Sequence, residues 1–277
     1  MASIGCALKS EKGQVRSTNQ DACCALVAQT PLGAIGMAVV CDGVGGLSQG
    51  DLASSYVVQE MATWFTNDLP VLFRTPKEDL CELRLDMVWD ELLGSLHQTL
   101  VSFGGHTQQL ATTFTGLVTY RGHYLVGQVG DSRLYLVRNG RATQLTHDQT
   151  LAMQLVEAGT LGYAQAKEHP SSHVVLQAIG AGTHMHPVFA SGTCSDDDLF
   201  VLCTDGVYGC LSADDIANCF VSFAPLDDSG LQEACANCVR KAMAAGSADN
   251  LSIVCMRGDP LGLADHGTLV VGDDDAW

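Results

Sequence analysis

The chain has 277 residues, of which 47% are hydrophobic and 16% charged, and 31 acidic against 14 basic side chains give a formal net charge of −17. A chain of this length and apolar content can bury a sizeable core and is not typical of a disordered protein. The acidic excess disfavours nucleic acids and anionic membrane surfaces as partners, because both would repel it.

The sequence also indicates where the protein resides. Residues 1–9 lack the pattern of a secretory leader, and the longest apolar run, residues 32–41, is far shorter than the roughly 20 residues of a membrane span. Most of the 12 cysteines lie inside apolar segments, where they act as small hydrophobic side chains in a reducing compartment. Cys235 and Cys238 form a C-x-x-C pair, but no second pair completes a zinc site. We expect a cytoplasmic protein without disulfides.

The N-terminal half predicts strands followed by helices. A polar loop precedes two apolar segments joined by a Pro-Gly turn, and two long segments with helical periodicity follow. The expected elements are a loop at 10–21, strands at 22–27 and 34–41, a helix at 51–65, a break at 67–76 and a helix at 78–103.

The C-terminal half begins with strands in quick succession, which favours an antiparallel sheet. Asn139-Gly140 is a strong hairpin signal between two of them. The expected strands lie at 111–120, 123–129, 133–137, 142–145, 199–203 and 251–256, and the expected helices at 149–158, from 212 onward and at 231–245. Residues 159–186 have no regular pattern and are expected to be a surface excursion. Without internal repeats, one domain over residues 1–257 is favoured, followed by an acidic, weakly ordered tail at 258–277.

One stretch, residues 38–46, stands out from this pattern. Its apolar run ends at a single carboxylate, Asp42, and three glycines follow at Gly43, Gly45 and Gly46. Glycines allow the backbone to turn tightly and bring its carbonyl groups near whatever the carboxylate holds. Hard divalent cations bind carboxylate oxygen, backbone oxygen and water. The alternative reading is an ordinary turn between a strand and a helix.

Other acidic side chains share this setting. Asp131, Asp205 and Asp249 lie at or beside the ends of apolar strands, and Asp21 lies near the start of the chain. If these carboxylates met at one sheet edge they would repel one another unless cations lay among them. Either they do not converge, or a metal cluster allows them to. Two divalent ions about 3.5–4 Å apart would suit hydrolysis of a phosphate ester.

Several motifs together resemble those of the type 2C, metal-dependent (PPM) family of bacterial serine/threonine protein phosphatases. They occur in the family's order between about residues 10 and 257, which makes a chance match improbable. The motifs are Gly13-x-Val15-Arg16-x-x-Asn19-Gln20-Asp21, Asp42-Gly43-x-Gly45-Gly46, Thr112-Thr113, Val129-Gly130-Asp131-Ser132-Arg133, Thr204-Asp205-Gly206 and Asp249-Asn250.

The resemblance implies an α+β fold, a four-layer α-β-β-α sandwich with two central antiparallel sheets, and a flap at about residues 149–180. It also implies two Mn²⁺ or Mg²⁺ ions, and a third in bacterial members. A metal-bridging hydroxide would attack phosphothreonine or phosphoserine directly. In these implied roles Asp42 bridges the two ions, Gly43 contributes its carbonyl to the first, Asp205 and Asp249 hold the second, Asp21 binds through water, Asp131 helps hold the third, and Arg16 binds the substrate phosphate.

Departures from the family pattern leave alternatives open. Val44 occupies a position where some relatives have a histidine thought to protonate the leaving group, so no side-chain acid is evident. The flap has Ser171-Ser172-His173 where many relatives carry arginine. The favoured partners are phosphorylated proteins, including a serine/threonine kinase or its substrates. The alternative functions are a non-catalytic regulatory module on the same fold and, ranked last, an unrelated nucleotide-binding protein.

Overall fold

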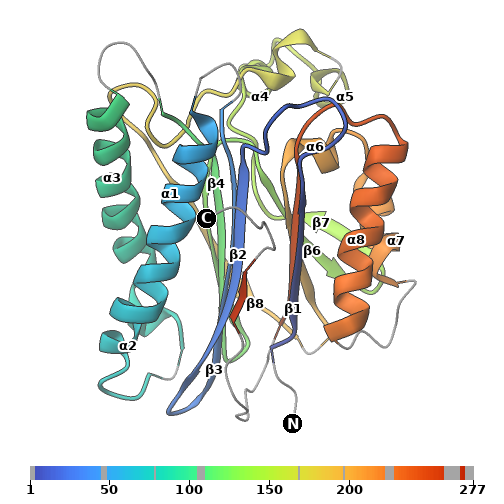
Figure 1. The fold of residues 1–277 in the computed structure, drawn as a ribbon. Coiled ribbons are helices and arrows are strands. Elements are labelled where there is room, and N and C mark those ends of the chain that lie inside the picture. Colours follow the sequence, from blue (N-terminus) through green and yellow to red (C-terminus); the bar gives the residue numbers. More distant parts are fainter. Residues whose placement is uncertain are drawn as a thin grey trace.

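Two antiparallel sheets lie face to face at the centre of the molecule, and helices cover both outer faces (Figure 1). This order of layers confirms the α-β-β-α sandwich predicted from the sequence. The structure is a computed structural model, and it describes residues 4–44, 49–77, 79–104, 110–167, 169–195, 197–221, 228–258 and 269–271.

Every strand pair in both sheets is antiparallel. In spatial order, the six-stranded sheet consists of β11 (Leu269–Val271), β2 (Asp21–Thr30), β3 (Gly33–Asp42), β4 (Phe114–Tyr120), β5 (His123–Val129) and β8 (Val188–Thr193). The five-stranded sheet consists of β1 (Cys6–Glu11), β10 (Leu251–Arg257), β9 (Leu199–Cys203), β6 (Arg133–Arg138) and β7 (Arg141–Gln144).

Helices pack on the two outer faces and around one end. The six-stranded sheet is covered by α1 (Gly50–Thr63), the π-helix η1 (Trp64–Asp68), α2 (Leu69–Leu72), the 3₁₀ helix η2 (Cys81–Leu83) and α3 (Leu85–Gly104). The five-stranded sheet is covered by α7 (Ala213–Val221) and α8 (Asp228–Ala244). At the upper end in Figure 1 lie α4 (Leu151–Glu157), α5 (Tyr163–Ala166), the 3₁₀ helix η3 (Pro170–His173) and α6 (Asp205–Tyr208).

Side-chain alternation in the central strands separates three apolar layers. In β3, Ile35 and Val39 face α1 and α3, whereas Ala38 and Val40 face the other sheet. Successive side chains of a strand point to opposite faces of its sheet. Because both faces of these strands are buried, their sequences are continuously apolar, as residues 34–41 are.

The structure corrects several predicted elements. Strands β1 and β8 were not predicted; the first lies in a segment read as a chain start and loop, and the second follows the irregular excursion. Both pair on one side only, β1 with β10 and β8 with β5, so neither needs a continuous apolar run. The predicted break at 67–76 contains the end of η1 and all of α2. The long helix predicted from residue 78 begins only at Leu85, because Arg84 before it has a left-handed backbone with a φ of 48°.

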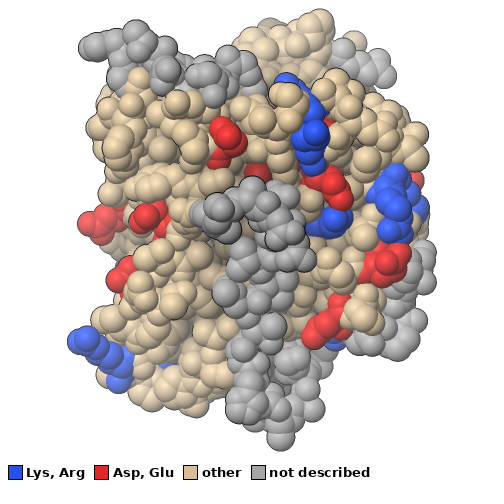
Figure 2. All heavy atoms as spheres, viewed as in Figure 1, with Lys and Arg blue, Asp and Glu red and all other residues tan. Residues whose placement is uncertain are grey.

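The structure shows the state of the cysteines and the distribution of charged side chains on one face. The twelve cysteines all lie among the described residues and none of them is in a disulfide, and Cys235 and Cys238 are buried in the face of α8 that packs on the sheet. Acidic and basic side chains are few and interspersed on the face drawn in Figure 2. No helix among the described residues is long and apolar enough to cross a membrane. The tail predicted at 258–277 lies mostly outside the described residues, but within it β11 pairs with β2.

Replacing Trp89 by alanine should destabilise the protein strongly. This fully buried ring packs edge-to-face on Trp64 and Phe114 at centroid distances of 5.9 and 5.7 Å, and lies over Gly116, where a side chain would collide with it. The cavity left by Trp89→Ala should lower the free energy of unfolding by about 3–5 kcal/mol, measured by urea denaturation. Met87→Ala, on the same helix but 56% exposed, should change it by less than about 1 kcal/mol.

Candidate active site

The first two acidic residues meet at the end of a hairpin. Asp21 opens β2 and Asp42 closes β3, and the two are direct partners in the antiparallel register. Two threonines hold the backbone of Asp42 in place. Its amide donates to Thr113 Oγ1 at 2.9 Å, and its carbonyl accepts from the Thr113 amide at 2.8 Å and from Thr112 Oγ1 at 2.9 Å. The threonine motif therefore fixes the position from which the Asp42 carboxylate projects.

The five-stranded sheet contributes two more acids. Asp205 opens α6 directly after β9, and Asp249 comes two residues before β10. The two turns touch, because a side chain at Gly206 would run into the carbonyl oxygen of Asn250. Glycine at that position lets the Asp205 turn lie against the Asp249 turn.

Asp131, in the connection between β5 and β6, is held by a chain of side chains. The Tyr208 hydroxyl donates to Asp131 Oδ2 at 3.2 Å. The guanidinium of Arg133 lies 3.8 Å over the Tyr208 ring and binds the carboxylate of Asp148 through Nε and Nη2 at 2.6–3.1 Å. Arg133 therefore braces the loop.

These segments surround one cavity of about 1010 Å³, which we call the acidic cavity, at the upper end of the sandwich in Figure 1. His173 and Val175, from the segment predicted to be a flap, also line it. Asp21 does not line the cavity but is buried beside Asp42. The sequence-predicted residues on the wall are Arg16, Asp42, Gly43, Asp131, Asp205 and Asp249.

Burial and mutual repulsion perturb these carboxyl groups. Burial, more than any neighbouring charge, raises the pKa of Asp21 and of Asp131 to about 7. The pKa of Asp42 is raised well above its usual range by burial and by the four other carboxylates. Burial and Asp249 raise the pKa of Asp205, which lies within hydrogen-bonding range of Asp42. The strand-end acids therefore converge on one cavity, and Arg16 is the one arginine or lysine among its described lining residues.

The oxygen atoms of the acidic cavity are of the kind that binds a divalent cation, but their present spacing does not form a ligand cluster. Asp21 Oδ1 and Asp205 Oδ1 are buried and have no hydrogen-bond partner, and carboxylate oxygens are the ligands that Mg²⁺ and Mn²⁺ prefer. Across the described residues, however, no three Asp, Glu, His or Cys side chains lie close enough together to hold one ion. Asp249 is directed elsewhere, because Arg16 binds both of its oxygens at 2.8 and 2.7 Å. The two buried carboxylate oxygens without a partner are the observation that fits a metal centre.

Asn250 is a site residue whose role the sequence did not predict. Its side chain accepts from the Gln20 amide at 2.8 Å and donates to the carbonyl oxygens of Lys12 and Thr18 at 2.8 and 2.9 Å. These bonds tie the Arg16 loop to the Asp249 turn. The Asp-Asn motif marked the position, but nothing in the sequence indicates which loop an asparagine binds.

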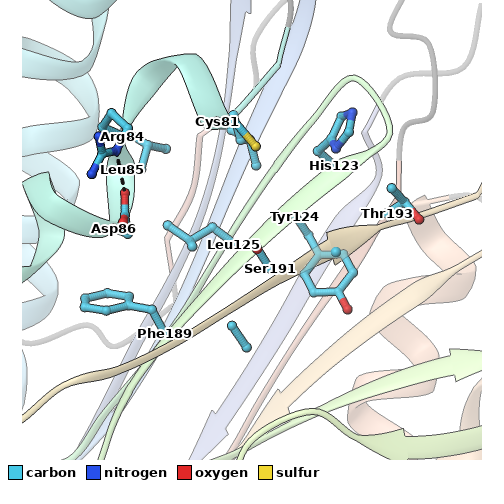
Figure 3. Close-up of a pocket in the computed structure, with 13 residues that line it drawn as sticks. Cys81, Arg84, Leu85, Asp86, His123, Tyr124, Leu125, Phe189, Ser191 and Thr193 are labelled. Carbon is cyan, nitrogen blue, oxygen red and sulfur yellow. Dashed lines mark ion pairs between the residues drawn. The ribbon is translucent and has the colours of Figure 1, made fainter.

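A second cavity of about 460 Å³ lies between the start of α3 and strands β5 and β8 (Figure 3). Leu85, Leu125 and Phe189 give it an apolar wall, and Arg84 pairs with Asp86 at 3.7 Å at its edge. None of the predicted site residues lines it. It therefore supplies matched residues for control variants.

Comparison with known proteins agrees with the geometry. The family model for protein phosphatase 2C matches residues 11–242. Protein phosphatase PhpP of Streptococcus pneumoniae is 26% identical over 247 residues, which cover 89% of this chain and 94% of PhpP. The crystal structure of the PPM Ser-Thr phosphatase MsPP from Mycobacterium smegmatis in complex with cacodylate is 27% identical, with a TM-score of 0.70 over 93% of this chain and 100% of that one. The catalytic domain of serine/threonine protein phosphatase PstP with two manganese ions has the same fold, with 23% identity and a TM-score of 0.71 over 92% of this chain and 99% of that one.

An acidic cavity between the ends of two antiparallel sheets and a family match over most of the chain define a phosphoprotein phosphatase, a hydrolase of phosphoric monoesters. The chain belongs to the protein phosphatase 2C family. The family and the class of enzyme are those predicted from the motifs.

The raised pKa values of Asp21 and Asp131 predict a pH dependence of stability in chelator-treated protein. Unfolded aspartates titrate near 4, but these two hold their protons to about 7, so between these values the folded chain binds more protons than the unfolded one. The free energy of unfolding should therefore fall as the pH rises from about 4 to about 7. Urea denaturation across this range should show a shallower fall for Asp131→Asn than for the exposed control Asp68→Asn; equal slopes would contradict the assignment.

Proposed function

We propose that this protein is a metal-dependent protein serine/threonine phosphatase that hydrolyses phosphothreonine and phosphoserine. The observation that carries the proposal is the convergence of acids from both sheets, with Arg16, on one cavity of about 1010 Å³. In an acidic protein, a cavity lined by carboxylates attracts cations and repels a phosphate group on its own. A phosphorylated substrate therefore requires bound cations there, which is the chemistry of this family.

The proposed ligands are hard oxygen donors from four separate turns. Asp42 would bridge two Mn²⁺ or Mg²⁺ ions, Asp205 and Asp249 would serve the second ion, and Asp131 with Asp205 would serve a third. When bound, the ions supply charge neutralisation and a water activated for direct attack on phosphorus. The complete ligand set is Asp21, through water, with Asp42, the Gly43 carbonyl, Asp131, Asp205 and Asp249.

The chain's own side chains orient the substrate. Arg16 presents a planar fork at the wall of the acidic cavity, and such a fork binds two phosphate oxygens at once. His173 and Val175 line the same cavity from the flap, where the peptide that carries the phosphorylated residue would lie. Gly43 packs against Gly50 and the Gln20 carbonyl too closely to admit a side chain, which keeps its backbone at the cavity wall.

We further propose that the substrates are phosphorylated proteins of the cytoplasm, among them a serine/threonine kinase or its targets. Similarity to the protein phosphatase PhpP and the Ser-Thr phosphatase MsPP supports a phosphoprotein substrate. The net charge of −17 favours substrates other than nucleic acids.

Hydrolysis of a phosphothreonine peptide should require Mn²⁺ and should fall at least about 10²-fold in Asp42→Asn, because even outer partners of a metal site contribute on that scale. The matched control is Asp86→Asn at the second cavity, which should retain wild-type turnover. Phosphate release with and without chelator measures both effects. Activity that survives chelation or the Asp42→Asn substitution would contradict the metal-dependent mechanism. Calorimetry that shows no Mn²⁺ binding would favour the alternative, a non-catalytic module on the same fold.

A further inference from the structure

Arg16 and Asp249 form a bidentate ion pair through the Nε–Nη2 edge of the guanidinium. Nε donates to Oδ1 at 2.8 Å and Nη2 donates to Oδ2 at 2.7 Å, across 233 positions of sequence. Both side chains line the acidic cavity, and they are 43% and 34% exposed. A bidentate pair of this kind is stronger and more directional than an ordinary surface ion pair.

The backbones that carry the two side chains are fixed relative to one another. Asn250 binds three backbone groups of the loop at residues 12–20, and its own amide donates to Asp249 Oδ1 at 2.8 Å. At Gly13 the loop packs directly on the carbonyl oxygen of Asp249, with a φ of +78° that favours glycine. The pair is therefore a built contact, and only its side chains need to move to open it.

Each partner of this pair has a second role in the proposed function. Asp249 is a proposed ligand of a divalent ion, and Arg16 is the proposed contact of the substrate phosphate. A guanidinium on both oxygens of Asp249 places a positive charge beside any ion bound there, and like charges repel. As long as Arg16 holds Asp249, the Nε–Nη2 edge of its guanidinium is likewise unavailable to a phosphate. The two ligands must therefore each displace the same contact.

We propose that the Arg16–Asp249 ion pair is a latch that couples loading of the divalent ion at Asp249 to binding of the substrate phosphate at Arg16. The inference rests on the proposed function and adds a regulation to the same site. A cation that binds Asp249 releases Arg16 toward phosphate, and a phosphate that binds Arg16 releases Asp249 toward the cation. Such linkage is reciprocal, so each ligand tightens binding of the other.

Calorimetric titration of Mn²⁺ tests the latch independently of turnover. Arg16→Ala, which removes the competitor, should bind Mn²⁺ at least about 5-fold more tightly than wild type. Arg16→Lys keeps the charge but loses the fork, so its affinity should lie between the two. The control Arg84→Ala, at the second cavity, should match wild type. If only the charge of Arg16 matters, Arg16→Lys will bind Mn²⁺ with the same affinity as wild type. That result overturns the latch.

Inorganic phosphate supplies the second arm of the experiment. At a fixed phosphate concentration the Mn²⁺ affinity of wild type should increase by a larger factor than that of Arg16→Ala, because the variant has no fork to release. Equal factors in both proteins, or unchanged Mn²⁺ affinity in Arg16→Ala, would overturn the proposal. Failure of the proposed function looks different: Mn²⁺ would then bind to none of the four proteins, and the latch would fall with it.

Discussion

Repulsion between buried carboxylates is the constraint that shapes the end of the sandwich where the two sheets stop. Burial and neighbouring carboxylates raise the pKa of Asp21, Asp42 and Asp205, so ionised groups there are unfavourable in the protein alone. The fold holds them together through neutral donors: the hydroxyl of Thr204 donates to Asp21 Oδ2 at 2.8 Å, and Thr113 fixes the backbone of Asp42 from both sides. These contacts keep the acids close without neutralising them, which leaves the attraction for cations in place.

Much of the fold could be predicted because the central strands are buried on both faces. Residues 34–41 form an unbroken apolar run for that reason, and the Asn139-Gly140 turn marked the β6–β7 hairpin. The three strands that the sequence did not predict, β1, β8 and β11, all lie at sheet edges. In β8 only Phe189 and Gly192 are even partly buried, so pairing with β5, rather than an apolar pattern, makes this segment a strand. Such pairing depends on a neighbour that the local sequence does not specify.

The sequence predicted the acidic residues of the candidate site but not the contacts that hold them. Each acidic residue could be found because it lies at or beside one end of a strand and belongs to a motif in a fixed order. What the sequence could not indicate is how those acids are held. The contact between Arg16 and Asp249, the three bonds of Asn250 and the hydroxyl of Tyr208 on Asp131 all join segments that are distant along the chain. No periodicity or spacing encodes these partners; they follow from the packing of the two sheets.

The middle layer of the core therefore has a functional consequence beyond stability. Asp42 belongs to the six-stranded sheet, whereas Asp205 and Asp249 extend from the five-stranded sheet, so the acidic cavity spans both. The relative position of the sheets is set by apolar side chains that interdigitate between them, Ala38, Val40, Leu117, Phe200, Leu202 and Val254 among them. Close-packed interiors transmit small changes of volume as displacements of whole elements. A change of side-chain volume in this layer would alter the separation of the carboxylates even though it touches none of them. The small residues of β3 that face β9 and β10 are therefore part of the geometry that sets the distances between these acids.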